Sequence, residues 1–253
     1  MKTKPLIVAS LALYVLLILG CTPGNQPVDQ KQTIMKSETS ALEYTLPAPA
    51  LTGKVSVEEA LSTRRSHRSF IDEAISALDL SQLLWSAYGI THPLSGYPQT
   101  QGGLRTAPSA GALFPLKIYV LIGRVKGIEP GVYRYSSKDH KITRFIDRDV
   151  REQLSTAALR QEMIKTAPAV IFYSADFSLT TSKYGDRGRE RYVCMDLGHS
   201  AQNVYLQAEA LHLGTCAIGA FNDEAVRTVM QLPANEEPLY IMPVGQYYHR
   251  LEF

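Results

Sequence analysis

The stretch YVCMDLGHSAQNVYLQAEALHLGTCAIGAF, residues 192–221, decides which fold the chain is expected to adopt. Its apolar residues are spread around nearly every side of a helix, so we expect this helix to lie inside the protein or between subunits. Gly214 is expected to end the helix, and residues 215–218 to form a short buried strand that leads to a loop at residues 219–221. A bare backbone turn there would let a flat ligand approach, although a plain core helix is the simpler interpretation.

Composition places the chain among globular proteins. Its 253 residues are 45% apolar, enough to bury a core within one domain. The net charge of +2 comes from 26 basic and 24 acidic residues without a basic block, so nucleic acid is not an expected partner. The cysteines, Cys21, Cys194 and Cys216, form neither a disulfide framework nor a spaced metal site, and no metal is expected. The simplest interpretation of Cys194 and Cys216 is two buried thiols.

Residues 1–20 have the features of a secretory signal peptide. Lys2 and Lys4 precede an apolar run, residues 6–19, that is shorter than a comfortable membrane span. The ending Leu19-Gly20-Cys21 resembles the lipobox of bacterial lipoproteins, although a residue smaller than Leu19 is usual there. The resemblance implies lipidation of Cys21 and anchoring to a bacterial membrane, with the body exported to the periplasmic or outer face. An uncleaved signal anchor is the alternative, and it also places the body outside the cytoplasm.

Residues 21–52 have the composition of a flexible tether, with several prolines, many polar residues and little periodicity. Tyr44 and Leu46 could pack against the body, but the spacing does not require it. The folded domain is therefore expected to span residues 53–253.

Capping residues and periodicity predict the secondary structure of this domain. Ser56 with Glu59 indicates a helix over residues 57–63, and Gly89 is expected to end a second helix, capped by Ser76 or Asp79. Residues 91–103, rich in Gly, Pro and Gln, are expected to form a loop. Two further helices are predicted at residues 150–159 and 223–232, and strands at residues 117–123, 131–135, 141–146, 169–175 and 239–244.

The end of the first helix carries a cluster of basic residues. If the helical turn persists, Arg64 and Arg68 share a face, Arg65 stands about 100° away, and Ser66 can add a hydroxyl. Converging positive charges of this kind suit a phosphate monoester. The alternative is that basic residues are simply favoured at helix C-termini by the helix dipole.

A second candidate segment, RTAPSAGALFP at residues 105–115, contains small residues bracketed by prolines. Such a backbone cannot form a normal helix, and it can press against a flat ring while Ser109 and nearby amides supply hydrogen bonds. The pattern is weak alone, because turns of small residues are common.

A third candidate segment, KYGDRGRERY at residues 183–192, precedes the central helix. Lys183 beside Tyr184 can serve as an acid and base pair if burial lowers the pKa of the lysine. The alternative is that this charged stretch is merely solvated.

Together these segments resemble the nitroreductase-like flavoproteins, and specifically their SagB-type branch, which includes azoline oxidases. The resemblance covers about residues 55–246, nearly the whole body. It rests on motifs that occur in the family's order: RRSHRSF (64–70), RTAPSAGALFP (105–115), GVYRY (131–135), KYGDRGRERY (183–192), GHSAQN (198–203) with AEALHLGTCAIGAF (208–221), and PLYIMPVGQ (238–246).

The resemblance implies an α+β fold with a central, mainly antiparallel sheet flanked by helices, in an interlocked homodimer that binds one FMN per subunit at the dimer interface. It assigns Arg64, Arg65, Ser66 and Arg68 to the FMN phosphate and ribityl chain, and Gly219 with Ala220 to the border of the isoalloxazine ring. It places Pro108, Ser109, Ala110 and Gly111 near the flavin of the other subunit. Arg250 is a looser candidate for the phosphate. Lys183 and Tyr184 match the catalytic Lys-Tyr pair of the azoline oxidases; Arg191-Tyr192 is the rival, and an arginine there could not act as a base.

The expected function is that of an exported, lipid-anchored FMN-dependent oxidoreductase that works by ping-pong hydride transfer on a small molecule or peptide. NAD(P)H is scarce outside the cell, which favours another donor or the dehydrogenase direction. Two alternatives remain open. One is a non-catalytic flavin or ligand-binding lipoprotein on the same scaffold, and the other is a structural lipoprotein without flavin, which would be colourless when purified.

Overall fold

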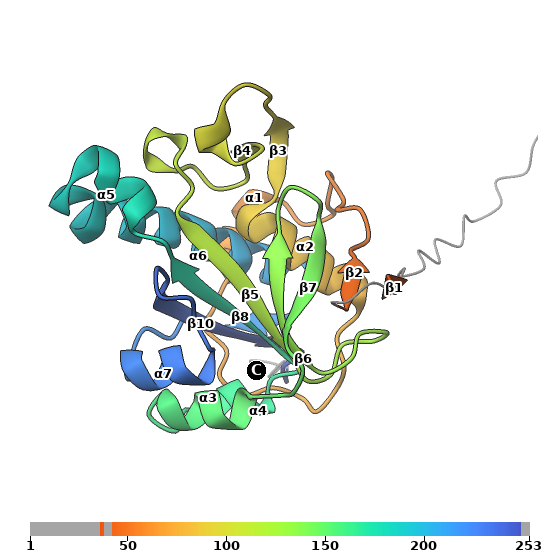
Figure 1. The fold of residues 1–253 in the computed structure, drawn as a ribbon. Coiled ribbons are helices and arrows are strands. Elements are labelled where there is room, and N and C mark those ends of the chain that lie inside the picture. Colours follow the sequence, from red (N-terminus) through yellow and green to blue (C-terminus); the bar gives the residue numbers. More distant parts are fainter. Residues whose placement is uncertain (1–35, 38–41, 249–253) are drawn as a thin grey trace, which may run out of the picture. The chain divides into compact units, whose positions relative to one another are not determined.

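The computed structural model describes residues 36–37 and 42–248. An antiparallel sheet of eight strands runs through this part of the chain in the order β1-β2-β7-β6-β5-β8-β10-β9 (Figure 1). The expected α+β class with a mainly antiparallel sheet is confirmed. The strands are β1 (Lys36–Ser37), β2 (Glu43–Thr45), β5 (Leu116–Ile122), β6 (Gly131–Ser136), β7 (Lys141–Ile146), β8 (Ala169–Ala175), β9 (Gly214–Thr215) and β10 (Glu237–Gly245).

Strand β8 is an interior strand of the sheet, between β5 and β10. Its sequence AVIFYSA is buried at every position, and β-branched and aromatic side chains of this kind suit a strand that is covered on both faces. Residue pairs such as Tyr119↔Phe172 and Ile241↔Phe172 fix its register against both neighbours. The predicted strand over residues 169–175 is therefore confirmed, and the predicted strands over residues 131–135 and 141–146 are confirmed as the paired strands β6 and β7.

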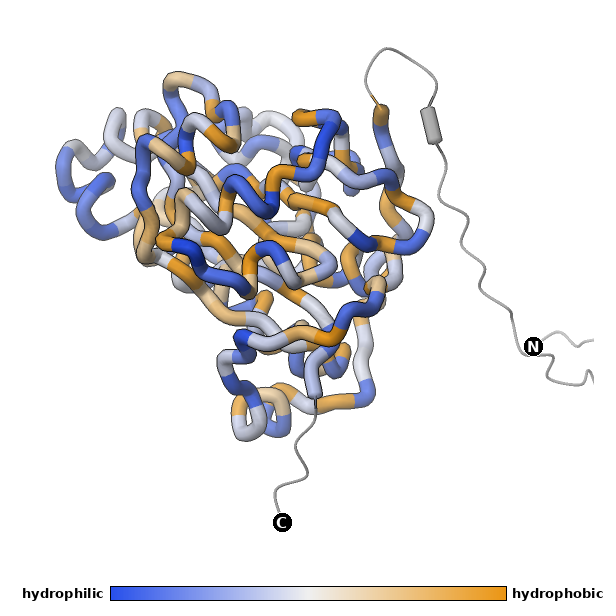
Figure 2. Tube along the Cα trace, turned by 90° about the horizontal axis from the view of Figure 1, so that it is seen from below, coloured by the Kyte–Doolittle hydropathy of each residue, from blue (hydrophilic) through white to orange (hydrophobic). Residues whose placement is uncertain are grey.

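Helices cover both faces of the sheet (Figure 1). Residues of α2 and α6 share one apolar cluster with one face of β5 and β8, and residues of α3 and α7 share a second cluster with the opposite face. In Figure 2 the hydrophobic stretches run mainly through the interior of the body, while hydrophilic stretches mark its outer turns. The helices are α1 (Val57–Thr63), α2 (Ala77–Tyr88), α3 (Arg151–Ala157), α4 (Met163–Thr166), α5 (Ser178–Tyr184), α6 (Val193–Ala210) and α7 (Asp223–Val229), with short turns η1 (Pro98–Thr100), η2 (Ala110–Ala112) and the π-helical η3 (Gly188–Tyr192).

The predicted caps account for where these helices begin. The Ser56 hydroxyl accepts a hydrogen bond from the amide of Glu59, and α1 has the predicted bounds. Ser76, one of the two candidate caps, forms a complete capping box with Asp79 at the start of α2. Asn222 caps α7 by accepting from the amide of Ala225.

Helix α6 has an exposed face within one chain, so it is not fully buried there, and its expected position between subunits stays a prediction. A buried stripe at helical spacing includes Val193, Leu197 and Val204. Outside this stripe Cys194 is exposed, and Met195, on the opposite side, keeps 53% of its surface accessible. The interpretation of Cys194 as a buried thiol is therefore wrong within one chain, whereas that of Cys216 is confirmed.

The folded body reaches into the stretch predicted to be a tether. Strand β2 pairs with β7, and the Tyr44 hydroxyl accepts a hydrogen bond from the amide of Glu129 at 3.2 Å. Leu46 is also buried, and its amide donates to the carbonyl of His140. Pairing between distant segments leaves no local sequence pattern. The folded body therefore begins earlier than residue 53, the start that was predicted from composition.

Residues 91–103 were predicted to form a loop, but they belong to a hairpin. Strands β3 (Ile90–Pro93) and β4 (Gly103–Arg105) form a second, two-stranded sheet, with η1 in the connection. Gly103 has a φ of +156°, and a Cβ there would lie 2.4 Å from the carbonyl oxygen of His92. The glycines therefore permit close strand pairing. Within the described ranges, no helix is both long enough and apolar enough to cross a bilayer.

Candidate functional site

The arginine segment, residues 64–68, leaves α1 as an extended chain. Arg64 has φ −49° and ψ 123°, so the predicted continuation of the helical turn through Arg68 is wrong. The reason is a competing backbone contact: the amide of His67 donates to the carbonyl of Thr215 at 2.9 Å. The arginine segment therefore runs beside strand β9, and its side chains do not share a helix face.

Tyr205 of α6 connects the arginine segment to the loop after β9. The Arg64 guanidinium lies 5.1 Å from the centroid of the Tyr205 ring. The hydroxyl groups of Tyr205 and Ser66 are 3.1 Å apart, and the amide of Ala217 donates to the Tyr205 hydroxyl at 2.7 Å. Sequence reasoning counted Tyr205 only as part of the apolar helix, and a tyrosine in such a run was the available signal.

The charges of the arginine segment are not matched by acidic side chains. Arg64 is half-buried, whereas Arg65 and Arg68 are exposed. Across residues 42–248, no carboxylate forms an ion pair with any of these arginines. Arg65 donates to the carbonyls of Ser62 at 3.1 Å and Arg64 at 2.9 Å, so it also caps the end of α1, as the helix-dipole alternative requires.

The loop after β9 carries Gly219 and Ala220, and both are exposed. A Cβ on Gly219 would lie 3.2 Å from the Tyr240 ring, so this backbone closely covers an aromatic side chain. Next to the loop, burial raises the pKa of the Cys216 thiol to about 11, although the Arg68 charge opposes the shift. Cys216 is therefore a protonated, packed thiol at neutral pH and not a nucleophile.

The small-residue loop, residues 108–112, is held by a buried carboxylate. Asp196 of α6 accepts hydrogen bonds from the Ser109 hydroxyl and from the amide of Ala110, the latter at 3.2 Å. The Ser109 oxygen also accepts from the amide of Phe114 at 3.0 Å. Both groups therefore stabilise the loop within one chain, and direct hydrogen bonding of Ser109 and its neighbouring amide to a ligand stays a prediction.

Asp196 itself was missed at the level of sequence. Only 2% of its surface is accessible, and burial raises its pKa despite the hydrogen bonds from Ser109 and Ala110. A lone Asp inside an apolar helix was the available signal, since a buried carboxylate requires partners.

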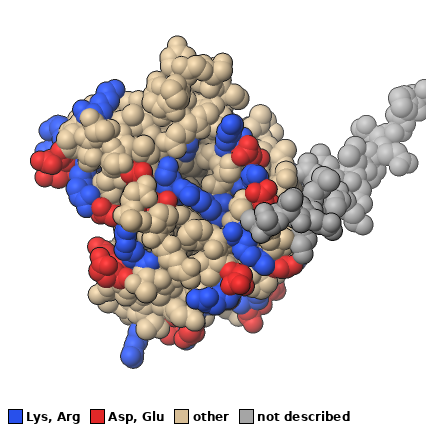
Figure 3. Space-filling view, in the orientation of Figure 1, with Lys and Arg blue, Asp and Glu red and all other residues tan. Residues whose placement is uncertain are grey.

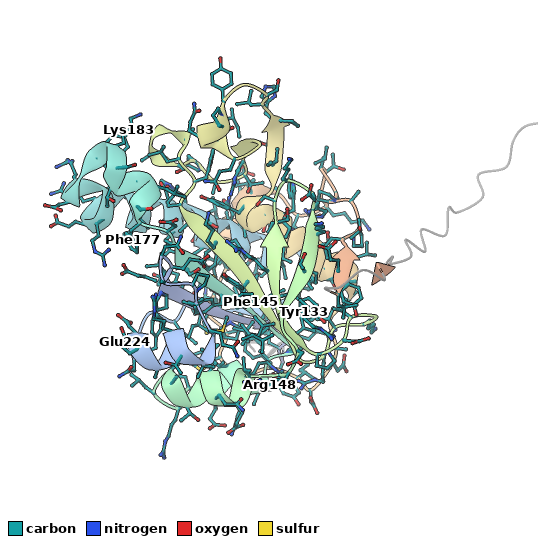
Figure 4. All side chains as sticks on the ribbon, in the orientation of Figure 1. Tyr133, Phe145, Arg148, Phe177, Lys183 and Glu224 are labelled. Carbon is teal, nitrogen blue, oxygen red and sulfur yellow. The ribbon has the colours of Figure 1, made fainter. Side chains whose placement is uncertain are left out.

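Lys183 and Tyr184 meet the small-residue loop at Gly111. Gly111 has a φ of +64°, and a Cβ there would lie 2.7 Å from the Tyr184 hydroxyl and 3.1 Å from Lys183 Nζ. Lys183 Nζ lies 5.2 Å from the centroid of the Tyr184 ring. Figure 4 labels Lys183 on α5, on the side towards that loop. Lys183 is exposed, so one chain alone does not provide the burial that acid and base chemistry was expected to need.

The rival pair, Arg191 and Tyr192, lies at the end of the π-helical turn η3. The Tyr192 hydroxyl accepts from Arg187 Nε at 3.0 Å, and its ring packs edge-on against Tyr184 with centroids 5.0 Å apart. Tyr192 therefore orients Tyr184, whereas Arg191 is exposed. π-Helical turns occur frequently at functional sites.

One chain places the two regions apart. The small-residue loop is held by Asp196 and the arginine segment by Tyr205, nine residues further along α6. At 1.5 Å per residue this is about 14 Å along the helix axis, and two and a half turns direct the two side chains to opposite sides. Arg250 and Cys21 lie outside the described residues. Within residues 36–37 and 42–248 no cluster of His, Cys, Asp and Glu could hold a metal ion.

The sequence matches the model of the Nitroreductase family over residues 61–246, which is most of the chain. The chain belongs to this family. Its relatives include the nitroreductase-named protein MJ1384 of Methanocaldococcus jannaschii, with 43% identity over 193 residues, 76% of this chain and 92% of MJ1384. A second relative, the trifolitoxin-processing protein TfxB of Rhizobium leguminosarum bv. trifolii, is 26% identical over 161 residues, 62% of this chain and 43% of TfxB.

Solved structures agree with the nitroreductase fold. A crystal structure named as a nitroreductase of Ralstonia eutropha superimposes with a TM-score of 0.70 and 26% identity, covering 82% of this chain and 90% of that one. A chain of the E. coli microcin synthetase McbBCD complex superimposes with a TM-score of 0.61 and 22% identity, covering 81% and 78% respectively. The latter similarity shows a shared fold alone. The described chain is thus an oxidoreductase scaffold with two candidate regions on either side of α6.

Proposed function

We propose that this nitroreductase-family oxidoreductase binds FMN at a site shared by two chains. The observation that carries the proposal is the arginine segment, where Arg64 and Arg68 have no acidic partner in the described chain. A phosphate with about two negative charges would match these groups and form charge-assisted hydrogen bonds with them. A Cβ at Gly111 would meet Lys183 and Tyr184, and one at Gly219 would meet Tyr240, so both backbones lie directly against these side chains. The residues present therefore fit FMN.

The homodimer is proposed from the same geometry. Arg64 and Gly111 belong to regions on opposite sides of α6, so one chain does not present both to one ligand. A second chain would bring its small-residue loop to the arginine segment of the first. Exposed apolar side chains support such pairing: Val57 and Leu61 of α1 and Met195 of α6 retain 63%, 54% and 53% of their accessible surface.

When bound, FMN would supply two-electron redox chemistry. Arg64, Arg65, Ser66 and Arg68 would hold its phosphate and ribityl chain, and the loop at Gly219 and Ala220 would border its ring. Lys183 and Tyr184 would hold or move a proton on the substrate, and a second chain would cover them from solvent. A ping-pong order, in which the donor product leaves before the acceptor binds, would need only one substrate position.

For the substrate, we propose a small molecule or peptide oxidised in the SagB-type manner. The support is the sequence relationship to TfxB, whose name describes processing of a toxin, although the chain spans less than half of TfxB. For localisation, we propose export and lipidation at Cys21, which would make the dehydrogenase direction or a donor other than NAD(P)H more suitable. Loss of lipid labelling in a Cys21→Ser variant would support this anchor, and unchanged labelling would contradict it.

The experiment that tests the function is purification of the protein followed by flavin absorbance, light scattering and a turnover screen with electron donors and acceptors. We expect a yellow dimer whose turnover falls in Lys183→Met and Tyr184→Phe variants. A colourless monomer that does not take up FMN would contradict the proposal. A yellow protein without turnover for any donor would favour a flavin-binding module instead.

A further inference from the structure

Strands β5 and β6 separate at one end, and a cavity opens between them. Their ladder runs from Ile122↔Gly131 to Tyr119↔Arg134 and stops there. Beyond that point the first residues of β5 pair only with β8, and the last residues of β6 pair only with β7. Figure 1 shows β5 diverging from the β6–β7 hairpin in this direction. We name the resulting cavity, of about 280 Å³, the fork pocket.

The fork pocket is lined by four basic residues and no acidic residue. Arg105, Lys117, Arg134 and Lys138 all line it, and the other lining side chains are uncharged. In the view of Figure 3, Lys and Arg side chains gather across the middle of the face formed over β5, β6 and β7. The pocket shares no residue with the arginine segment or the loop at Gly219.

Most of this charge is not neutralised by the described part of the chain. Arg134 pairs with Glu236 at 3.2 Å, but Glu236 does not line the pocket and also accepts from Tyr119 and Ser174. Lys117 donates only to the uncharged side chain of Gln101, at 3.3 Å. Lys138 forms no ion pair within residues 42–248.

The surroundings of Arg105 also indicate a ligand, in addition to the unneutralised charge of the pocket. Its guanidinium packs against the rings of Tyr88, 4.2 Å from the centroid, and Phe114, 4.6 Å from the centroid. Its Nε is buried without a hydrogen-bond partner in the described chain, and an unpaired buried donor is unfavourable. Burial lowers the pKa of both Arg105 and Lys117. At Lys117 the neighbouring Arg134 charge adds to this shift, and the carboxylates of Glu236 and Asp176 oppose it without cancelling it.

We propose that the fork pocket binds a small oxyanion, a carboxylate or phosphate group, through Lys117, Arg105 and Lys138. Arginine and lysine donors in a partly dry cavity bind such groups strongly. The volume is at the lower limit of ligand pockets, so the ligand is a small molecule and not a whole nucleotide. This site is additional to the proposed flavin site and does not depend on it.

Gln101 links the fork pocket to the region around the small-residue loop. Its side-chain amide donates to the carbonyls of Leu113 at 2.9 Å and Phe114 at 3.0 Å, while its oxygen accepts from Lys117. An anion that draws Lys117 away would break the hydrogen bond between Lys117 and Gln101. Gln101 also holds the carbonyls of Leu113 and Phe114, directly after η2, so the anion would affect this part of the chain.

The experiment is isothermal titration calorimetry of the full, purified protein, saturated with FMN, in a low-salt buffer without phosphate. Inorganic phosphate and succinate are the probes, and saturation with FMN keeps them from the arginine segment. We expect at least one probe to bind with a sub-millimolar Kd, and Lys117→Met to weaken it at least tenfold. Lys126→Met, which removes an exposed lysine outside the pocket, is the matched control and should leave binding unchanged.

Several results would overturn the proposal: no binding of either probe, or equal binding by the Lys117→Met and Lys126→Met variants. Loss of binding in an Arg64→Met/Arg68→Met variant but not in Lys117→Met would assign the anion to the arginine segment instead. If Lys117→Met fails to fold, as judged by circular dichroism, Lys138→Met at the exposed rim should weaken binding at least threefold, and unchanged binding would overturn the proposal. A flavin-free protein that still binds anions through Lys117 would contradict the proposed function while leaving this site standing.

Discussion

The arginine segment and the small-residue loop lie on opposite sides of one helix and differ in how their polar groups are used. In the loop, the Ser109 hydroxyl and the Ala110 amide are both bound by the buried Asp196. In the arginine segment, Arg64 and Arg68 have no acidic partner within residues 42–248. The small-residue loop therefore uses its polar groups to hold its own conformation. The arginine segment instead presents positive charges that no described carboxylate neutralises. A ligand that needs both would have to meet them from two chains.

Removing the charge should have the largest effect. Arg64→Met with Arg68→Met removes two proposed phosphate contacts, each worth about 1.5–3 kcal/mol, so FMN should bind at least about 100-fold more weakly. Fluorescence titration of the protein with FMN measures this. Arg148→Met, at an exposed position outside the segment, is the control and should bind normally. Equal FMN affinity in the double variant and the control would remove the arginine segment from the proposed site.

Removing the carboxylate that shapes the loop should act on stability instead. Asp196→Ala leaves the Ser109 hydroxyl and the Ala110 amide without their partner, so the free energy of unfolding should fall by about 1–3 kcal/mol. Ser109→Ala should cost less, and adding it to Asp196→Ala should cost little more, because both changes disrupt one network. Urea unfolding measures all three variants. Fully additive losses would show that the two residues act separately.

A more specific test concerns the contact between the loop and α5. Gly111→Ala places a methyl group 2.7 Å from the Tyr184 hydroxyl and forces a residue with a Cβ to keep a φ of +64°. The left-handed conformation alone should cost about 1–2 kcal/mol, and the clash should add to it. Tyr184→Phe removes the clashing oxygen, so the double variant should recover the steric part only. No recovery in thermal unfolding would show that Tyr184 does not contact the loop.

The smallest expected effect is a dependence on pH. Burial raises the pKa of Asp196, so the folded protein holds this proton more tightly than the unfolded chain does. That contribution to stability is complete below the ordinary pKa of about 4 and is lost as the pH rises through the folded-state value. The stability of the wild type relative to Asp196→Asn should therefore decline from pH 4 towards neutrality. Urea midpoints across this range measure it, and a relative stability that rises with pH would be the contrary result.

Local patterns predicted the regular parts of the fold. The bounds of α1 and β8 followed from a cap at Ser56 and from an unbroken apolar run. Contacts between distant segments could not be predicted in this way. The pairing of β2 with β7 and the bond from His67 to Thr215, which ends the helix before Arg64, depend on tertiary structure.

The candidate site was predicted to a similar extent. The segments at Arg64, Gly111 and Lys183 were identified from their composition and from the family resemblance, and the structure brings Lys183 to Gly111. Asp196 and Tyr205, which hold the two regions, were missed because an apolar helix pattern does not reveal which of its polar members are paired. Their roles depend on what lies opposite them in the folded chain.

Mixing two inactive variants tests the shared site most directly. One variant carries Arg64→Met and Arg68→Met, and the other carries Lys183→Met and Tyr184→Phe. In the proposed dimer each site takes its arginine segment from one chain and its Lys183 and Tyr184 from the other. A mixed dimer therefore contains one site with neither defect and one site with both. After unfolding and refolding together, half of the dimers should be mixed, and about one quarter of wild-type turnover should return. Turnover that stays at the level of the separate variants would place the complete site within a single chain and contradict the proposal.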